Sequence, residues 1–281
     1  MSVGFSPPFD TPETGVIGSL LYPLRGAEGV AMASALGTIL WGATVLAPEY
    51  CLAIWADANT LGTPSLGVLI ILISAIPAFL LSPLFVIYLL QYLGRVLVSS
   101  ARGDCLPPRL PDRNFEGFFH GLSPWLIWLV LGAAVGLLPC AVLFSTGDQP
   151  FSSRPFLAWS LVLLGMPYAL AALMLSFLHD RPMACAPTGV LMALPRHGGA
   201  LLPTLVLATF LLGAAGALCL GLFALRDRFV WVYLIMALPW WILAVWIAIV
   251  TMRLLGLNYY RYADALKWHG KHPRWGVRWK L

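Results

Sequence analysis

The stretch VWVYLIMALPWWILAVWIAIVTM, residues 230–252, decides the fold class of this chain. It contains no acidic, basic or histidine side chain. About 20 apolar residues in a helix are enough to cross the roughly 30 Å hydrocarbon layer of a bilayer. A helix also satisfies its own backbone hydrogen bonds, which lipid cannot do. The stretch therefore predicts a transmembrane helix.

The rest of the sequence repeats this composition in blocks. The 281 residues are 60% hydrophobic and 10% charged, whereas a soluble domain has about a quarter of its residues charged. We therefore predict an all-α polytopic membrane helix bundle with interfacial amphipathic helices. Its six transmembrane helices would form three hairpins, with spans at 29–48, 66–92, 121–145, 156–178, 201–224 and 230–252.

The basic residues predict the orientation of these spans. The N-terminal segment, the second and fourth links and the tail together hold 14 of the 17 Lys and Arg residues. Because short cytoplasmic segments collect basic residues, we expect a multi-pass protein of the plasma (inner) membrane with both termini cytoplasmic. The expected division is 1–28 (cytoplasmic or interfacial segment), 29–252 (transmembrane domain) and 253–281 (basic aromatic cytoplasmic tail).

The two ends of the chain are expected to lie at the membrane surface. Residues 15–24 are too short, and too interrupted by Pro23, for a signal peptide, and the first residues lack a basic region. In the tail, apolar residues at 255, 259, 262 and 266 share one helical face. Basic and aromatic residues accompany that face and predict surface anchoring: Arg261, Lys267, Trp268, Lys271, Arg274, Trp275, Arg278 and Trp279.

The expected partner of this tail is a bilayer with anionic headgroups, since each nearby Lys or Arg adds about 1 kcal/mol of attraction. Docking on the chain's own loops or on a partner protein is the alternative. Nucleic acid is not expected, because basic residues interleaved with aromatics next to a span are typical of any interfacial anchor.

The fourth and sixth spans align without gaps at an offset of 72, which predicts a hairpin repeat. Trp159, Pro167 and Arg181 then correspond to Trp231, Pro239 and Arg253. The second span also has a proline near its middle. Because a proline removes one helical hydrogen bond, we predict helix kinks at Pro77, Pro167 and Pro239.

Small residues recur at four-residue spacing in two spans. The rows are Gly132 and Gly136, and Gly213, Ala217 and Gly221. Such rows let helix backbones approach closely in lipid, where the hydrophobic effect between helices is missing. They predict helix packing within one bundle, with the face of a homo-oligomer as the alternative.

No predicted span carries an ionisable side chain near its centre. This disfavours proton-coupled carriers, intramembrane metalloproteases and buried haem, which need such groups at depth. The five cysteines are scattered, and the five histidines lack ligand spacing. His120, His179, His197, His269 and His272 could in principle gather with Cys105, Cys185 and Asp180 on the cytoplasmic side. We expect no cofactor, metal site or catalytic group.

Two cytoplasmic links have recognisable structure. In the first, 95–122, Gly103-Asp104 predicts a turn. The second, 185–199, predicts a short interfacial helix that begins at Pro187 and ends at Pro195 to Gly198.

The run Tyr92, Arg95, Gly103-Asp104, Leu106-Pro107, Pro111-Asp112 and Gly121 resembles an uncharacterised family of bacterial multi-pass membrane proteins. Members carry a GD–LP–D loop before a membrane hairpin, and RLLGLNYYRYADALKW (253–268) is similar to their last helix. The chain departs from the family at LPPRLPDRN (106–114), where an acidic and aromatic stretch is more usual. The resemblance implies the topology and no activity.

The sequence thus favours a non-catalytic integral membrane protein that scaffolds, packs against or helps assemble other membrane components. Its expected partner is another membrane protein or a second copy. A small-molecule or lipid carrier working through proline-kinked hairpins is the alternative. A membrane enzyme at the cytoplasmic face is the second alternative, with Asp104, Asp112, His120, His179 and Asp180 as candidates.

Overall fold

The computed structural model describes residues 16–60, 63–108, 115–145, 155–179, 182–226 and 228–266. Within these ranges every regular element is a helix. Five helices are long and apolar enough to cross a membrane: Ala27–Thr60, Ser82–Arg102, Trp159–Leu178, Leu201–Arg226 and Val230–Tyr262. The all-α class is confirmed, and the five helices fit a multi-pass membrane protein. The remaining predicted span lies in a helical run whose described apolar part, Leu122–Leu138, is shorter.

The first half of the chain forms two long helical runs after a short N-terminal segment. The segment consists of α1, Val16–Leu20, and the 3₁₀ helix η1, Tyr22–Arg25. The first run joins three elements: α2, Ala27–Trp41, the π-helical η2, Gly42–Leu46, and α3, Ala47–Thr60. The second run is the single helix α4, Pro64–Arg102.

The second half has the same character. One run joins α5, Phe115–Trp128, the π-helical η3, Leu129–Ala133, and α6, Ala134–Ser145. The helix α7, Pro155–Leu178, follows, and the 3₁₀ helix η5, Pro182–Cys185, lies between it and the next helix. The last two helices are α8, Pro187–Arg226, and α9, Val230–Leu266.

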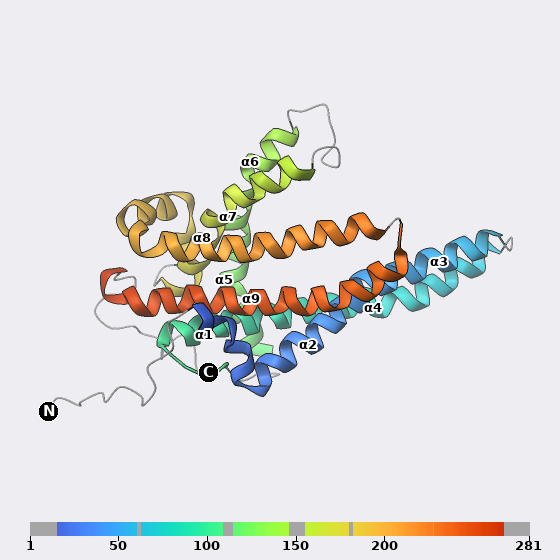
Figure 1. Cartoon of the computed structure of the whole chain (residues 1–281), viewed down its shortest axis with the longest axis horizontal. Coiled ribbons are helices and arrows are strands. Elements are labelled where there is room, and N and C mark those ends of the chain that lie inside the picture. Colours follow the sequence, from blue (N-terminus) through green and yellow to red (C-terminus); the bar gives the residue numbers. More distant parts are fainter. Residues whose placement is uncertain are drawn as a thin grey trace.

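Helices that follow each other in sequence lie side by side: α3 with α4, α6 with α7, and α8 with α9 (Figure 1). The pairs meet at one end of the molecule, which we call the junction. From there α6 and α7 rise away from the other helices, while α9 continues beside α2 and α4 (Figure 1). Helix α9 is central, because it contacts α1, α2, α4 and α8.

The main hydrophobic core lies at the junction. It is built from the C-terminal parts of α4, α7 and α9 together with parts of α2 and α8, and Leu97 of α4, Leu173 of α7 and Leu255 of α9 are fully buried in it. A separate small cluster of Val45, Tyr233 and Ala237 joins the far part of α9 to η2. Packing inside the chain is therefore concentrated at one end of the helices.

Two helices extend further in the structure than the sequence predicts. Helix α8 begins at Pro187 as predicted but does not end at Pro195 to Gly198, since it continues to Arg226. Helix α9 runs past residue 252, because Leu255 and Tyr259 are buried in the junction core. This part of the tail docks on the chain itself, as in the alternative interpretation.

Of the predicted surface-anchoring residues, only Arg261 lies within the described part of the chain. Arg261 is exposed at the end of α9. The other predicted anchors lie outside the described residues: Lys267, Trp268, Lys271, Arg274, Trp275, Arg278 and Trp279.

The predicted kink positions fall inside helices that continue through them. Pro167 lies in α7 and Pro239 in α9. Position 77 lies within the helical range of α4.

The two predicted small-residue rows have different surroundings. A Cβ atom on Gly132 would lie 2.7 Å from Ala172 Cβ of α7, and one on Gly136 would lie 3.0 Å from the Gly165 carbonyl oxygen. In the second row, a Cβ on Gly213 would lie 2.7 Å from the Leu163 side chain. Ala217 is exposed, and Gly221 has nothing within 4 Å of such a Cβ. The first row therefore packs against α7, and the second does so at Gly213.

The closest helix approach gives a direct test. A Cβ on Gly165 would overlap the Gly136 carbonyl oxygen, so Gly165→Ala should destabilise the protein by about 1–3 kcal/mol through overpacking. Gly221→Ala is the matched control, which should be neutral or stabilising by up to about 1 kcal/mol because alanine favours helix. Thermal unfolding in detergent measures both. Equal melting temperatures for the two variants would contradict the α6–α7 packing.

Candidate functional site

The most unusual side chain in the described structure is Arg253, which is a cation with only 1% of its surface exposed. Its guanidinium carbon lies 4.3 Å from the centre of the Tyr22 ring. Its Nη1 donates to Ser100 Oγ at 3.2 Å and to the backbone carbonyl of Asp104. We call these four residues the Arg253 node. It joins the N-terminal segment, the end of α4 and α9 at the junction.

The end of α4 places the Asp104 carbonyl. Gly103 has φ of 89°, in the left-handed region, where a side chain would be strained. The Gly103 N–H donates to Ser100 O at 3.1 Å and the Asp104 N–H to Ser99 O at 3.1 Å. These two bonds form a Schellman turn, which stops the helix and satisfies two of its last carbonyls. The predicted Gly103-Asp104 turn is confirmed, and it presents the next carbonyl to Arg253.

Gly256 brings α9 close enough to α4 for Arg253 to reach these partners. A Cβ on Gly256 would lie 2.5 Å from both Leu97 O and Ser100 Cβ. Residues three apart on a helix share a face, so Arg253 lies over the same part of α4. Because Gly256 has no side chain, α9 lies close to α4, and the Arg253 guanidinium can reach its partners at the end of α4.

Tyr22 contributes both its ring and its hydroxyl. The hydroxyl donates to the Leu106 carbonyl at 3.1 Å. Burial raises the pKa of Tyr22 above 10, although the Arg253 charge and hydrogen bonds with Ser99 and Ser100 act in the opposite direction. Tyr22 is therefore a neutral hydrogen-bond donor at physiological pH. It connects the N-terminal segment to the loop after α4.

Asp104 binds Arg253 through its backbone. Burial raises the pKa of the Asp104 carboxyl, and the charges of Arg102 and Arg253 lower it. The net rise means that ionising the carboxyl is harder here than in water. The hydrogen bond from Arg253 goes to the backbone carbonyl of Asp104.

The node suits a structural role. Taking a guanidinium out of water costs free energy unless hydrogen bonds replace the water, and here a hydroxyl, a carbonyl and an aromatic face do so. A planar guanidinium makes these contacts at once, which an ammonium does not. The arrangement holds three distant chain segments together.

A second polar contact lies at the far end of α8. Arg226 Nε pairs with Glu49 Oε1 of α3. Nearby, Trp41 Nε1 donates to the Leu234 carbonyl of α9 at 2.9 Å. We call these two contacts the far-end clasp. It joins the α8–α9 pair to the first helical run.

Tryptophans bridge helices at further places. Trp128 Nε1 donates to Ala169 O of α7 at 2.7 Å, and Trp240 Nε1 donates to Ala215 O of α8 at 2.9 Å. Trp41 and Trp128 each come directly before a π-helical turn. Such turns are rare and are often found at functional sites. These indoles act as interhelical donors, whereas the sequence suggests only that tryptophans suit membrane interfaces.

The residues proposed for surface chemistry are not brought together by the part of the chain that can be described. Of the enzyme candidates, Asp104 belongs to the node and His179 follows α7. Asp112 and Asp180 lie outside the described residues, as does the side chain of His120. Among the residues searched, which exclude those same positions, no three His, Cys, Asp or Glu side chains lie close enough to hold a metal ion.

Sequence reasoning missed the role of Arg253. It counts this arginine among the basic residues of the tail, since Arg253 follows the last apolar span directly. Its aromatic partner Tyr22 is far away in sequence, and no local pattern links the two. The residues that carry the family resemblance did contain a signal. Gly103-Asp104 forms the turn, and the carbonyls of Asp104 and Leu106 accept hydrogen bonds from Arg253 and Tyr22.

No family model matches the chain, and neither a curated protein nor a solved structure is significantly similar to it. The resemblance to the bacterial multi-pass family therefore remains a prediction.

The node predicts a specific order of mutational effects. Arg253→Lys keeps the charge but loses the planar group, so it should cost about 1.5–3 kcal/mol, as for a lost hydrogen bond to a charged group. Asp104→Asn keeps the backbone acceptor and should change stability by less than about 0.5 kcal/mol. Thermal unfolding in detergent compares the two.

Arg261→Lys, at an exposed position of the same helix, is the matched control and should also have little effect. A loss for Asp104→Asn as large as that for Arg253→Lys would show that the carboxylate is the true partner.

Proposed function

We propose that this chain is a non-catalytic integral membrane protein that scaffolds other membrane components. The observation that carries the proposal is the contrast between the core and the surface. The buried residues gather in one main core at the junction, while large apolar side chains are exposed along the helices around and beyond it. Such a protein fixes several helix pairs at one end and offers their remaining faces to its surroundings.

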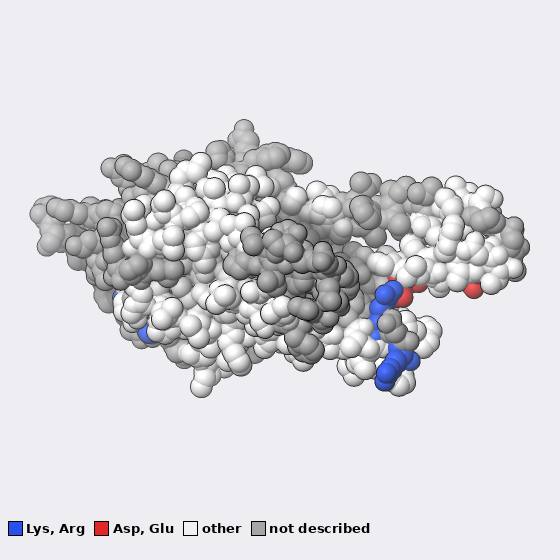
Figure 2. Space-filling view, turned by 90° about the horizontal axis from the view of Figure 1, so that it is seen from above, with Lys and Arg blue, Asp and Glu red and all other residues white. Residues whose placement is uncertain are grey.

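The exposed faces support this proposal in detail. Trp231 of α9 is 75% exposed, Leu164 of α7 71% and Phe210 of α8 70%. On the face drawn in Figure 2, the charged atoms of the described residues form a small group at the left and a larger group right of the centre, and the other described atoms belong to uncharged residues. Apolar surface of this extent suits lipid or another membrane helix.

We place the junction on the cytoplasmic side of the plasma (inner) membrane. The basic second and fourth links and the tail belong to that end of the helices, and cytoplasmic segments collect Lys and Arg. The far ends, with the Arg226–Glu49 pair, would then face outwards. In this arrangement the helical run 115–145 is the third of six spans, and the three pairs are in–out–in hairpins.

Two native cysteines test this orientation. Cys51 lies in α3 towards the far end and Cys105 lies at the junction, and both are partly exposed. In variants that retain one of these cysteines and no other, a membrane-impermeant maleimide should label Cys51 in intact cells. Cys105 should react only after permeabilisation. The reverse pattern would overturn the orientation.

The scaffold function predicts a stable complex. Extraction in a mild detergent should yield a particle heavier than the 30.6 kDa chain, containing a partner protein or a second copy at fixed stoichiometry. Light scattering of the purified particle with mass spectrometry of its components measures this. A monodisperse single chain that stays monomeric in lipid nanodiscs would contradict the proposal.

A carrier of small molecules or lipids is the second candidate, and the prolines and π-helical turns inside the helices favour it. Pro167, Pro239 and the two π-helical turns lie within the apolar helices, where transporter helices also bend. A carrier needs a water-accessible path between the pairs. Cysteine scanning from Trp159 to Pro167 and from Trp231 to Pro239 would detect it, and complete shielding from water-soluble reagents would remove this candidate.

A further inference from the structure

A groove of about 250 Å³ opens on one face of α9, lined by Pro239, Ile242, Leu243 and Trp246. These four residues recur at helical spacing and are all apolar. They lie within a helix that is long and apolar enough to span a membrane. The groove is therefore a place for an apolar group at hydrocarbon depth.

Two neighbouring elements limit what fits there. Helix α2 reaches the backbone of α9 at Gly37, where a Cβ would lie 2.7 Å from Ile242 Cα. The short α1 reaches α9 at Trp246, whose Nε1 donates to the Leu20 carbonyl at 3.1 Å. A helix with its side chains is about 10–12 Å wide, so a single turn of it has a larger volume than this hollow of about 250 Å³. A single acyl chain is narrow enough to lie in it.

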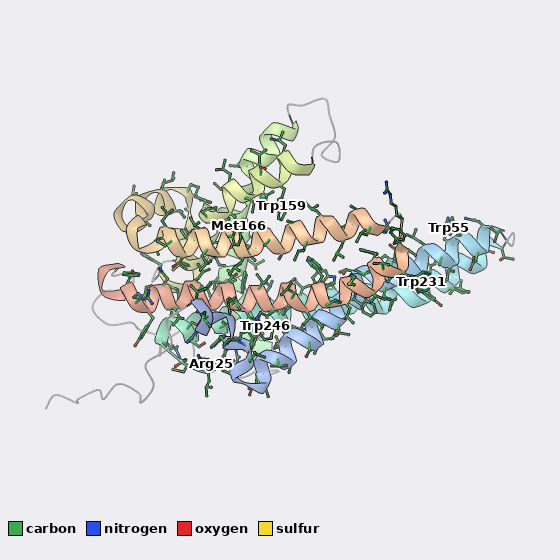
Figure 3. The ribbon with its side chains drawn as sticks, viewed as in Figure 1. Arg25, Trp55, Trp159, Met166, Trp231 and Trp246 are labelled. Atoms are coloured by element: carbon green, nitrogen blue, oxygen red, sulfur yellow. The ribbon has the colours of Figure 1, made fainter. Side chains whose placement is uncertain are left out.

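A cation lies at the depth of a lipid headgroup above this groove. Arg25 ends the same 3₁₀ helix that carries Tyr22, and the Tyr22 ring contacts Arg253. Arg25 is partly exposed, and Figure 3 shows Arg25 and Trp246 beside the same N-terminal segment. Arg25 is thus at the level of Arg253, at the junction end of α9.

The spacing along α9 matches one lipid leaflet. At 1.5 Å per residue, Trp246 lies about 10 Å and Pro239 about 21 Å from Arg253 along the helix. Half of a bilayer, from the headgroup surface to the midplane, is about 20–22 Å thick. A phosphate at the level of Arg25 therefore brings the acyl chain of the same molecule over Trp246, Leu243 and Pro239.

The N-terminal segment is suited to a position beside such a lipid. Its apolar side chains face outwards, and Ile17 is 74% exposed. Leu20, Leu21 and Leu24 are exposed as well. A helix with this surface lies at the boundary between headgroups and acyl chains.

We propose that the groove binds one anionic phospholipid of the cytoplasmic leaflet, with its acyl chain on Pro239–Trp246 and its phosphate at Arg25. This inference rests on the proposed orientation of the chain. The bound lipid fixes the N-terminal segment against α9 and so covers the Tyr22 side of the Arg253 node.

Native mass spectrometry tests this with phosphatidylglycerol and phosphatidylcholine added in equal amounts to the detergent-purified full chain. The wild type should retain one phosphatidylglycerol in preference to phosphatidylcholine. Leu243→Trp fills the groove and should abolish this retention. Arg25→Gln should reduce the preference about fivefold, the effect of one cation at the headgroup level.

Matched controls alter the same residue types elsewhere. Leu164→Trp adds the same bulk at an exposed site on α7, and Arg228→Gln removes an exposed arginine at the far end. Both should retain lipid as the wild type does. Equal retention by Leu243→Trp and Leu164→Trp would show only annular lipid and would overturn the site.

A second measurement does not depend on a stable Leu243 variant. Phosphatidylglycerol brominated on its acyl chain should quench tryptophan fluorescence of the wild type more than that of Trp246→Phe. Equal fractional quenching of the two proteins would also overturn the site. If the cysteine labelling shows the predicted orientation and no lipid is retained, only this inference fails. If the orientation is reversed, this inference fails with it, and the scaffold function is then judged by the composition of the purified particle alone.

Discussion

The contact of Arg253 with Tyr22, Ser100 and the Asp104 carbonyl is the interaction on which the arrangement of the helices depends. It unites an N-terminal segment, the end of α4 and the central helix α9, which have no sequence proximity. A buried guanidinium tolerates few alternative geometries, because each lost partner leaves part of a charge without solvation. The hydrophobic core around it stabilises the junction, but apolar contacts are not directional. The hydrogen bonds of the node require specific distances and angles, so they define how the helix ends are positioned relative to one another.

The sequence predicts the helical class well, since hydropathy is a local property. Each apolar block contains enough information to indicate a helix, and five of the blocks form helices of spanning length. The Gly103-Asp104 turn is predictable for the same reason, because its two bonds close within six residues. The helix start at Pro187 is likewise set by local geometry.

The contacts between distant segments are not predictable in this way. Arg253 reads as one more basic residue after a span, and its burial depends on Tyr22, Ser100 and Gly256 together. Composition places tryptophans at membrane interfaces in general, whereas Trp128 and Trp240 donate to carbonyls of neighbouring helices. The π-helical turns after Trp41 and Trp128 also leave no simple trace in the sequence. In each case the deciding partner lies on another helix.

The two ends of the molecule differ in how strongly they are joined. At the junction a buried cation, a Schellman turn and a continuous core act together. At the far end, the α8–α9 pair is joined to the first helical run by a partly exposed ion pair, an indole hydrogen bond and a small apolar cluster. Because partly exposed ion pairs contribute at most about 1 kcal/mol, separating the far ends costs much less than separating the junction. The proposed scaffold function would use this difference, with a base of fixed geometry at the junction and apolar helix faces that meet lipid or a partner.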